Sequence, residues 1–461
     1  MSIDGTFTEP RQTRGTLALS FGLATVFTLF LFGLLTAGPA HAATFTVNST
    51  GDENDLDFPG GTFDGSSDGR CDVDAGTTGN QCTLRAAIQA ANKRRGADTI
   101  AFNIPESGVQ TISPGSALPT ITKRVTIDGY TQSGAQKNTL TEPDKTNAVL
   151  MIQLSGGGLV LTNGASNSVI KGLAIGGCSN FLCLGGIRLA GGKGYKIQGN
   201  FLGTGADGTT PQANDTGIDV QFTSGSTIGG TDADDGRLDG VVEARNIISG
   251  NTVFGVFVED NSPGNRIEGN LIGTDKNGGS LGNGFEGVAI TSSGNTGNRI
   301  LSNSIYSNTG FGIDLDNDGV TANDARDPDT GPNRLQNYPL ITSAQTFGSF
   351  TSISGTLDST PSVKRKIRRN GKVRTRVVRR SFTIQFFSSP DKDPSGFGEG
   401  KTFLGQVQVT TDLQGQASFS FAPNQVVPVG QFVTATATRM TTGDTSEFSE
   451  ARIVEEPVIG P

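Results

Sequence analysis

Short apolar segments separated by Gly, Asn, Asp and Ser follow one another between about residues 98 and 335. In one type, Gly is followed by an apolar residue, any residue and a second apolar residue; it occurs at 186–189, 217–220, 255–258, 287–290 and 312–315. A second type begins with Ile and ends with Asn, at 197–200, 248–251, 267–270 and 300–303. Segments this short between turn residues are typical of β-strands.

Successive copies of the first type start 31, 38, 32 and 25 residues apart. That spacing fits one coil with a loop of variable length. It predicts an all-β solenoid in which each strand pairs only with the coils above and below, around a column of Ile, Leu and Val. The repeated Asn has two interpretations: an internal ladder of side-chain amides, or turn chemistry alone, because Asn tolerates left-handed backbone.

The segments on either side of this repeat have other patterns. Residues 83–92 predict an amphipathic helix, capped by Thr83, that covers the amino-terminal end of the solenoid as such ends require. From about residue 336 to residue 456, longer alternating strands predict an antiparallel β-sandwich. These strands are expected at 351–355, 382–387, 405–409, 417–421 and 432–437.

The amino terminus has the three parts of a secretory signal. Two arginines precede an apolar stretch at 17–35, and Ala40, His41 and Ala42 follow as a small-residue cleavage pattern. We expect residues 1–42 to be removed after Ala42 and the chain to be exported, secreted or held at the cell surface. The alternative is an uncleaved anchor, and no later segment is apolar enough to span a membrane.

Four cysteines are then expected to form disulfides, since an even count in an exported chain favours them over metal thiolates. Short loops favour Cys71 with Cys82 and Cys178 with Cys183, among three possible pairings. Composition adds two exclusions. The single histidine, His41, lies in the signal, which disfavours histidine-dependent triads and histidine-ligated metals, and the chain has no Trp, the best platform for stacking sugars.

Residues 82–88, with the sequence CTLRAAI, resemble the motif of the CSLREA-type amino-terminal region of bacterial exported proteins. Residues 46–50, 98–100 and 125–132 and the Asn repeats are similar to the same group, whose β-helix is right-handed and parallel. The sandwich, with residues 393–400 and 430–437, resembles a domain commonly appended to such helices. The resemblance implies an Ig-like sandwich and an exported or surface protein. It is weak for activity, because the same pectin lyase-like fold elsewhere carries pectate lyases and polygalacturonases.

An Asp-rich segment follows the last repeat. Asp314, Asp316 and Asp318 alternate before Gly319, as at positions 1, 3, 5 and 6 of a calcium loop. Position 12 is Ala325 and not Glu, so the segment is no EF-hand, and Asp324 or Asp327 is expected to supply the missing ligand. We predict a structural calcium ion here; the alternative is a solvated Asp-rich turn.

The middle residue of each Gly-apolar strand is expected to point away from the core. These residues form an outward row of Arg188, Asp219, Phe257, Ala289 and Asp314. Asp219 and Asp314 would be about 14 Å apart at roughly 4.8 Å per rung, too far for a glycosidase pair at about 5 to 9.5 Å. For a lyase, Arg188, Arg266 or Arg299 is a candidate base, but none is favoured over an ordinary surface arginine, so no catalytic residue is predicted.

Residues 364–380 interrupt the sandwich with ten Lys or Arg and no acid, which leaves a formal charge of −18 on the rest of a chain whose net charge is −8. Asn370-Gly371 is a strong hairpin signal. We predict a protruding arm that binds an anionic polymer such as lipopolysaccharide, acidic polysaccharide or nucleic acid, or else is only a solvated extension. The basic residues are Lys364, Arg365, Lys366, Arg368, Arg369, Lys372, Arg374, Arg376, Arg379 and Arg380.

These patterns divide the chain into a signal (1–42), a CSLREA-like region (43–97), a parallel β-helix (98–335) and a sandwich (336–456). The leading interpretation is a non-enzymatic, exported protein that binds polysaccharide or another surface polymer in an adhesion-type role. The alternatives are a calcium-dependent polysaccharide lyase or other carbohydrate-active enzyme, and a structural protein of an envelope or matrix. The protein partner is not predicted, and fold alone does not choose among these functions.

Overall fold

The computed structural model describes residues 42–56, 70–179, 185–369 and 372–457, so nearly all of the predicted signal lies outside the described residues. The described chain is mostly β and contains one α-helix, α1 (Leu84–Lys93). Four short 3₁₀ helices lie in loops: η1 (Gly129–Thr131), η2 (Asn163–Ala165), η3 (Asp232–Asp235) and η4 (Pro332–Leu335). No described helix has the length and apolar content needed to cross a bilayer.

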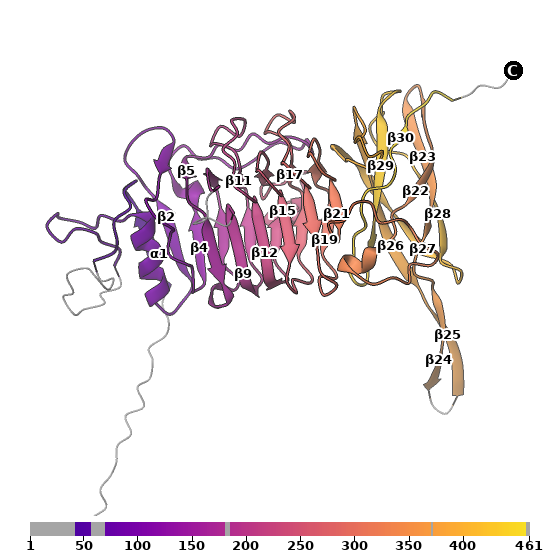
Figure 1. Cartoon of the computed structure of the whole chain (residues 1–461), viewed down its shortest axis with the longest axis horizontal. Coiled ribbons are helices and arrows are strands. Elements are labelled where there is room, and N and C mark those ends of the chain that lie inside the picture. The colour runs from indigo at the N-terminus through magenta and orange to yellow at the C-terminus, as the bar shows by residue number, and fades with distance from the viewer. Residues whose placement is uncertain (1–41, 57–69, 180–184, 370–371, 458–461) are drawn as a thin grey trace, which may run out of the picture. The chain divides into compact units, whose positions relative to one another are not determined.

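Three long parallel sheets form the body of the fold, residues 44–315 (Figure 1). The first sheet contains β1 (Thr44–Val47), β2 (Asp98–Phe102), β4 (Val125–Asp128), β7 (Val169–Lys171), β10 (Lys196–Gln198), β13 (Thr227–Gly229), β16 (Arg266–Glu268) and β19 (Arg299–Leu301). The second contains β3 (Gln110–Ile112), β5 (Ile152–Ser155), β8 (Leu173–Gly176), β11 (Phe201–Leu202), β14 (Ile247–Ile248), β17 (Leu271–Ile272) and β20 (Ser304–Ile305). The third contains β6 (Leu159–Thr162), β9 (Ile187–Lys193), β12 (Ile218–Ser224), β15 (Val256–Glu259), β18 (Val288–Ile290) and β21 (Ile313–Leu315).

From β10 onward, the chain visits the first, second and third sheets in turn, once per coil. The register pairs Ile187 with Ile218, then Val256, Val288 and Ile313, so the irregular sequence spacing does correspond to one coil per repeat. Buried Ile, Leu and Val from all three sheets form one continuous core. This arrangement fits a parallel β-helix.

Two ladders of four buried Asn side chains each run along the coils. In one, Asn200, Asn246, Asn270 and Asn303 are joined by amide hydrogen bonds of 2.8 to 3.2 Å. In the other, the series is Asn214, Asn251, Asn283 and Asn308. Where these turns contain left-handed backbone, it falls on the preceding residue, such as Gly199 or Gly269, and not on the Asn. The ladder is therefore the main role of these asparagines. The grouping of 248–251 with the other Ile-to-Asn segments was wrong, because Ile248 lies in the second sheet and Ile197 in the first.

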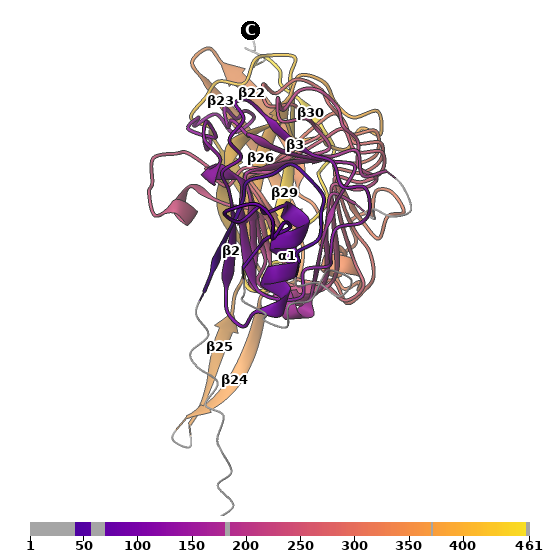
Figure 2. The same ribbon diagram turned by 90° about the vertical axis from the view of Figure 1, so that its left-hand side faces the viewer.

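Helix α1 lies against the first strands of the body (Figure 2). The Thr83 hydroxyl accepts a hydrogen bond from the Ala86 amide at 3.1 Å, as expected of an N-cap. Every residue from Leu84 to Ala91 is buried, including Arg85, whose guanidinium donates to Asp52 at 2.9 Å and to two backbone carbonyls. The disulfide between Cys71 and Cys82 is confirmed, with an S–S distance of 1.98 Å. Cys183, the predicted partner of Cys178, lies outside the described residues.

The carboxy-terminal strands form two antiparallel sheets around a second core, which includes Phe382, Ile384 and Phe386. One sheet contains β22 (Leu340–Phe347), β23 (Phe350–Asp358) and β28 (Gln416–Phe421). The other contains β27 (Thr402–Thr411), β26 (Arg380–Ser389), β29 (Phe432–Arg439) and β30 (Arg452–Ile453). A separate hairpin joins β24 (Val363–Arg369) to β25 (Lys372–Val378).

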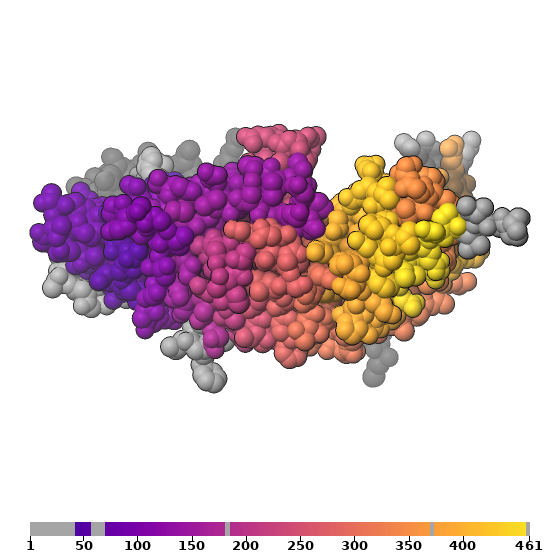
Figure 3. Space-filling model, turned by 90° about the horizontal axis from the view of Figure 1, so that it is seen from above, coloured from indigo at the N-terminus to yellow at the C-terminus, as the bar shows by residue number. Residues whose placement is uncertain are grey.

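The four-stranded antiparallel sheet and its loops contact the last coil of the body, and the two parts lie against each other in Figure 3. The backbones of Ile305 and Gly400 exchange two hydrogen bonds of 2.9 Å. The Glu399 carboxylate accepts from the Asn308 side chain at 2.8 Å and so ends the second ladder. Phe387 and Phe448 belong to the core of the body. The edge strands and the apolar cross-section at this end are thereby covered.

Candidate functional site: the outward face of the third sheet and the basic hairpin

The outward row on the third sheet is present in the predicted register. Arg188, Asp219, Phe257, Ala289 and Asp314 are neighbours on successive strands. Asp219 and Asp314 are three rungs apart, or about 14 Å at the usual strand spacing. The row is less open than an outward face implies, because Ala289 and Asp314 are nearly inaccessible and Asp219 is only 6% exposed.

Asp219 is a buried carboxyl with one unsatisfied oxygen. Its Oδ2 lies 3.4 Å from Nε of Arg188, whereas Oδ1 has no hydrogen-bond partner. Burial raises the pKa of Asp219 to about 7 against the opposing attraction of Arg188, and the nearby carboxylate of Glu259 adds to the increase. The Arg188 guanidinium also donates to Gln221, whose amide donates to Glu259. A polar chain therefore crosses three strands beside a carboxyl that can hold a proton near neutral pH.

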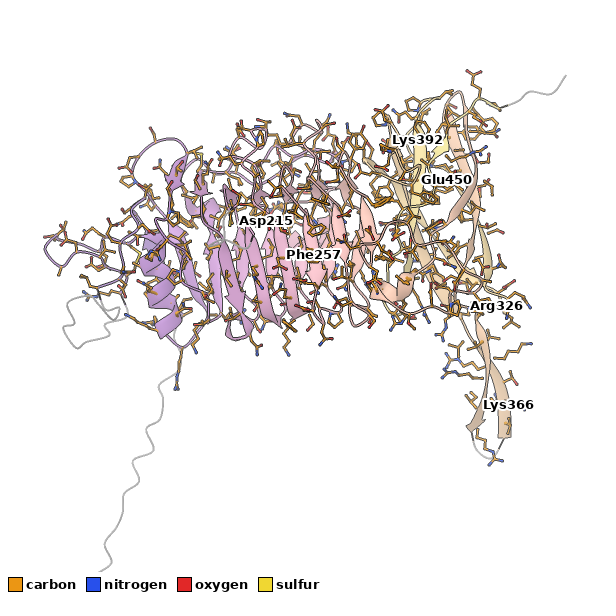
Figure 4. The ribbon with its side chains drawn as sticks, in the orientation of Figure 1. Asp215, Phe257, Arg326, Lys366, Lys392 and Glu450 are labelled. Atoms are coloured by element: carbon orange, nitrogen blue, oxygen red, sulfur yellow. A yellow bond between two sulfur atoms is a disulfide. The ribbon has the colours of Figure 1, made fainter. Side chains whose placement is uncertain are left out.

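Aromatic side chains lie next to this polar chain. The rings of Phe254 and Phe257 are stacked with their centroids 4.5 Å apart, and Phe285 contacts Phe254 at 6.1 Å. Phe285 is 53% exposed, and Phe257 is partly exposed (Figure 4). One coil further along, Glu286 is buried, with an unsatisfied Oε2 and a pKa raised by desolvation. Phe257 was predicted on this face, whereas Phe254 and Glu286, which precede their strands in loops, were not.

The predicted calcium ligands fall into two separate groups. The Asp314 carboxylate accepts hydrogen bonds from the backbone amides of Asp318 and Gly319 at 3.3 and 3.1 Å. Burial raises the pKa of Asp314 to about 6. The Asp316 and Asp318 residues are exposed.

Among the described residues, the acidic group with metal-ligand spacing consists of Asp324, Asp327 and Asp329, whose ligand atoms lie within 4.8 Å of one another. Burial followed by repulsion from its two neighbours raises the pKa of Asp329 to about 6. The Asp327 carboxylate already accepts from Ser359 at 2.6 Å and from the Asn337 amide at 3.1 Å. The geometry thus brings two of the five predicted ligands together with Asp329.

The three arginines considered as bases do not share a face. Arg188 lies on the third sheet, whereas Arg266 and Arg299 are neighbours on the first. Arg266 is 2.5 Å from the Glu268 carboxylate, and that hydrogen bond raises the pKa of Arg266. A guanidinium held protonated in this way is a poor base.

A small cavity of about 130 Å³ on the first sheet was not predicted. It is lined by Tyr130, Lys137, Lys171, Glu243 and other polar residues. Lys137 pairs with Glu243 at 2.6 Å, and Lys171 pairs with Asp128 at 2.8 Å. Both cations are thus matched by acids within the chain, and Asp234 and Asp235 also line the cavity.

The basic hairpin of β24 and β25 forms the predicted arm, which pairs with no other described strand (Figures 1 and 4). Its described side chains from Lys364 to Arg368 and from Val373 to Val377 are exposed. The Asn370-Gly371 turn and the side chains of Arg369 and Lys372 lie outside the described part. Arg379 is exposed, and Arg380 begins β26.

Comparison with models of known protein families and with curated proteins finds no match to this chain.

Proposed function

We propose that the chain is an exported, right-handed parallel β-helix protein of the CSLREA type, with α1 as its amino-terminal cap and an Ig-like sandwich at its carboxy-terminal end. The order in which the chain visits the three sheets, the burial of α1 and the two antiparallel sheets around one core support this class. The signal pattern before Ala42 and the Cys71–Cys82 disulfide support export.

Its function in this proposal is to bind polysaccharide or another surface polymer along the third sheet. The observation that carries this is the stacked Phe254–Phe257 pair beside the ring of Phe285, which is 53% exposed. Aromatic faces stack on sugar rings. A repeated face suits a repeating polymer.

Replacing Phe257 with Ala tests this function. We expect F257A to weaken retention in affinity gels that contain polysaccharide by about five-fold, because the stacking contact is worth about 1 kcal/mol. F350A is the matched control, since Phe350 stacks on Phe347 in the sandwich at 5.0 Å. Equal retention of F257A, F350A and the wild type on every polymer that the wild type binds would place the binding face elsewhere.

A carbohydrate-active enzyme is the second candidate, and the pKa of about 7 at Asp219 favours it. A carboxyl that titrates near neutrality suits general acid catalysis. Incubation with a panel of uronate polysaccharides and calcium, followed by ultraviolet absorbance and reducing-end assays, separates a lyase from a hydrolase. Product formation that D219N abolishes would replace the binding function; no product on polymers that the chain binds would support it.

We also propose that Asp324, Asp327 and Asp329 hold a structural calcium ion. Three carboxylates within 4.8 Å repel one another, and a divalent cation removes that repulsion. Chelator is expected to lower the melting temperature by several degrees, and D329N is expected to abolish the difference, whereas D316N keeps it. Identical melting curves with calcium and with chelator would contradict the site.

Finally, we propose that the basic arm binds anionic polymers through salt-sensitive charge contacts. All described basic side chains from Lys364 to Arg376 are exposed, and no acid lies within residues 364–380. The wild-type chain is expected to bind heparin resin. The variant that lacks residues 364–380 is expected to elute at a much lower salt concentration. Retention that survives the deletion would remove this role of the arm.

A further inference from the structure

The basic arm also exposes aliphatic side chains, and these point to the kind of anionic partner. Ile367, Val373 and Val377 are 42%, 55% and 45% exposed. None of them belongs to a core of the body or of the sandwich. Exposing three branched aliphatic side chains to water is unfavourable. Contact with an apolar phase would remove their surface from solvent and so favour binding.

The hairpin register sorts the side chains onto two faces. One face pairs Arg365 with Arg376 and Ile367 with Arg374. On the other face, Lys364, Lys366 and Arg368 of β24 lie opposite Val377, Thr375 and Val373 of β25. The second face thus has a row of cations alongside a row of small, mostly aliphatic side chains.

The cations of the arm lack acidic partners among the described side chains. All ion pairs among the described residues lie outside β24 and β25. Arg365 lies directly opposite Arg376, and like charges in that position repel each other. A bound anion removes that repulsion, and the planar guanidinium matches phosphate oxygens in a bidentate manner.

We propose that the arm docks on the phosphate-bearing surface of an anionic lipid bilayer, with Val373 and Val377 in the interfacial layer and the neighbouring cations on the phosphates. Long cationic side chains reach lipid phosphates while their stems lie along apolar surface. Each cation near an anionic leaflet adds to the attraction. A soluble nucleic acid or acidic polysaccharide would neutralise the same charges but leave the aliphatic row in water. This inference rests on the proposed anion-binding role of the arm.

Co-sedimentation with vesicles tests the proposal on the full chain without its signal. Wild-type chain is expected to bind phosphatidylglycerol vesicles and not phosphatidylcholine vesicles. The double variant V373T/V377T keeps all the charges and the shape of the strand, and it is expected to weaken vesicle binding by about ten-fold while its heparin retention is unchanged. The triple variant K364Q/K366Q/R368Q, which removes the cations on the same face as Val373 and Val377, is expected to weaken both kinds of binding.

The vesicle and heparin assays distinguish a failure of the lipid inference from a failure of the anion-binding role. If V373T/V377T binds vesicles as tightly as the wild type, the lipid inference is wrong and the arm is a general anion binder. Strong DNA or heparin binding without any vesicle binding favours a soluble polymer and also overturns it. If the triple variant retains both ligands, the anion-binding role itself fails. Melting curves of both variants should match the wild type, because the arm contributes to no core.

A fluorescent probe gives a second readout, because the chain contains no Trp. V373W should show a blue-shifted emission and quenching by brominated acyl chains when phosphatidylglycerol vesicles are added. L238W is the control, since Leu238 is an exposed residue of the body, 84% accessible. An unshifted V373W spectrum in the presence of sedimented, vesicle-bound protein would show that the aliphatic row stays in water.

Discussion

The stability of the chain is expected to fall as the pH rises from about 5 to 8, and Glu399 is one of the two carboxyls with the largest contribution. This carboxyl is 4% exposed at the junction of the body and the sandwich, where it accepts the last amide of an Asn ladder. Desolvation raises its pKa from 4.5 to about 8. The folded state therefore holds a proton that the unfolded state has released, and folding weakens with pH across this window.

The expected change in the free energy of unfolding is large. A shift of this kind corresponds to about 1.4 kcal/mol per pKa unit, or roughly 5 kcal/mol in total at alkaline pH. Glu447 adds in the same direction: burial raises its pKa to about 8, although it accepts the Leu315 and Thr321 amides at 2.9 Å. Below the pKa of the unfolded state, the stability does not depend on the ionisation of either carboxyl. Above the pKa of the folded state, the loss of stability from each carboxyl is complete.

E399Q tests the assignment, because Gln keeps an acceptor for Asn308 and never ionises. Urea unfolding at pH 5, 7 and 9 should show similar stabilities for E399Q and wild type at pH 5 and a more stable variant at pH 9. E106Q, at an exposed loop residue, is the control and should follow the wild type. If wild type and E399Q have the same pH dependence, Glu399 does not carry the effect.

Replacing Asn270 with Asp is expected to destabilise the body by about 3 kcal/mol or more at neutral pH. The Asn270 amide is fully buried and donates to Asn303 Oδ1 and to the Ile228 carbonyl, both at 2.9 Å. Asp has almost the same shape, so no cavity forms. It replaces two donated hydrogen bonds with a carboxylate oxygen that faces two other oxygens, and this repulsion is relieved only when the carboxyl is protonated.

The same variant separates the two interpretations of the repeated Asn. If Asn served only the turn, Asp would be tolerated nearly as well, since both residues suit turns. N261D is the matched control at an exposed, left-handed position, where φ is 54°. A melting temperature of N270D within a degree or two of the wild type, at pH 7 and at pH 4, would contradict the ladder as a source of stability.

Local pattern predicted much of the architecture. The helix expected at 83–92 is α1, and the hairpin expected at 364–380 contains β24 and β25. The Gly-apolar strands lie in one sheet, in register. These predictions succeeded because periodicity, an N-cap and turn residues act within a few positions along the chain. The proposed functions of these elements are still predictions.

Membership of a sheet was harder to predict. The first sheet takes Ile228, from a segment that lacks the terminal Asn, whereas Ile248 belongs to the second sheet. The loop between these residues, including η3, makes this coil longer than its neighbours. Two short segments of similar sequence can therefore belong to different sheets. Only the three-dimensional structure shows to which sheet each one belongs.

The sequence by itself determined that the chain folds as stacked short strands, that one helix precedes them and that one insertion is strongly basic, because each property resides in neighbouring residues. Only the tertiary structure decided which groups meet across many residues: Glu399 at the end of a ladder that starts at Asn214, Asp219 beside Arg188, and Phe254 on Phe257 as a platform next to them. The physical reason is desolvation. Whether a carboxyl keeps its proton or an amide needs a partner depends on what surrounds it, and in a stacked-coil fold most of those surroundings come from other coils.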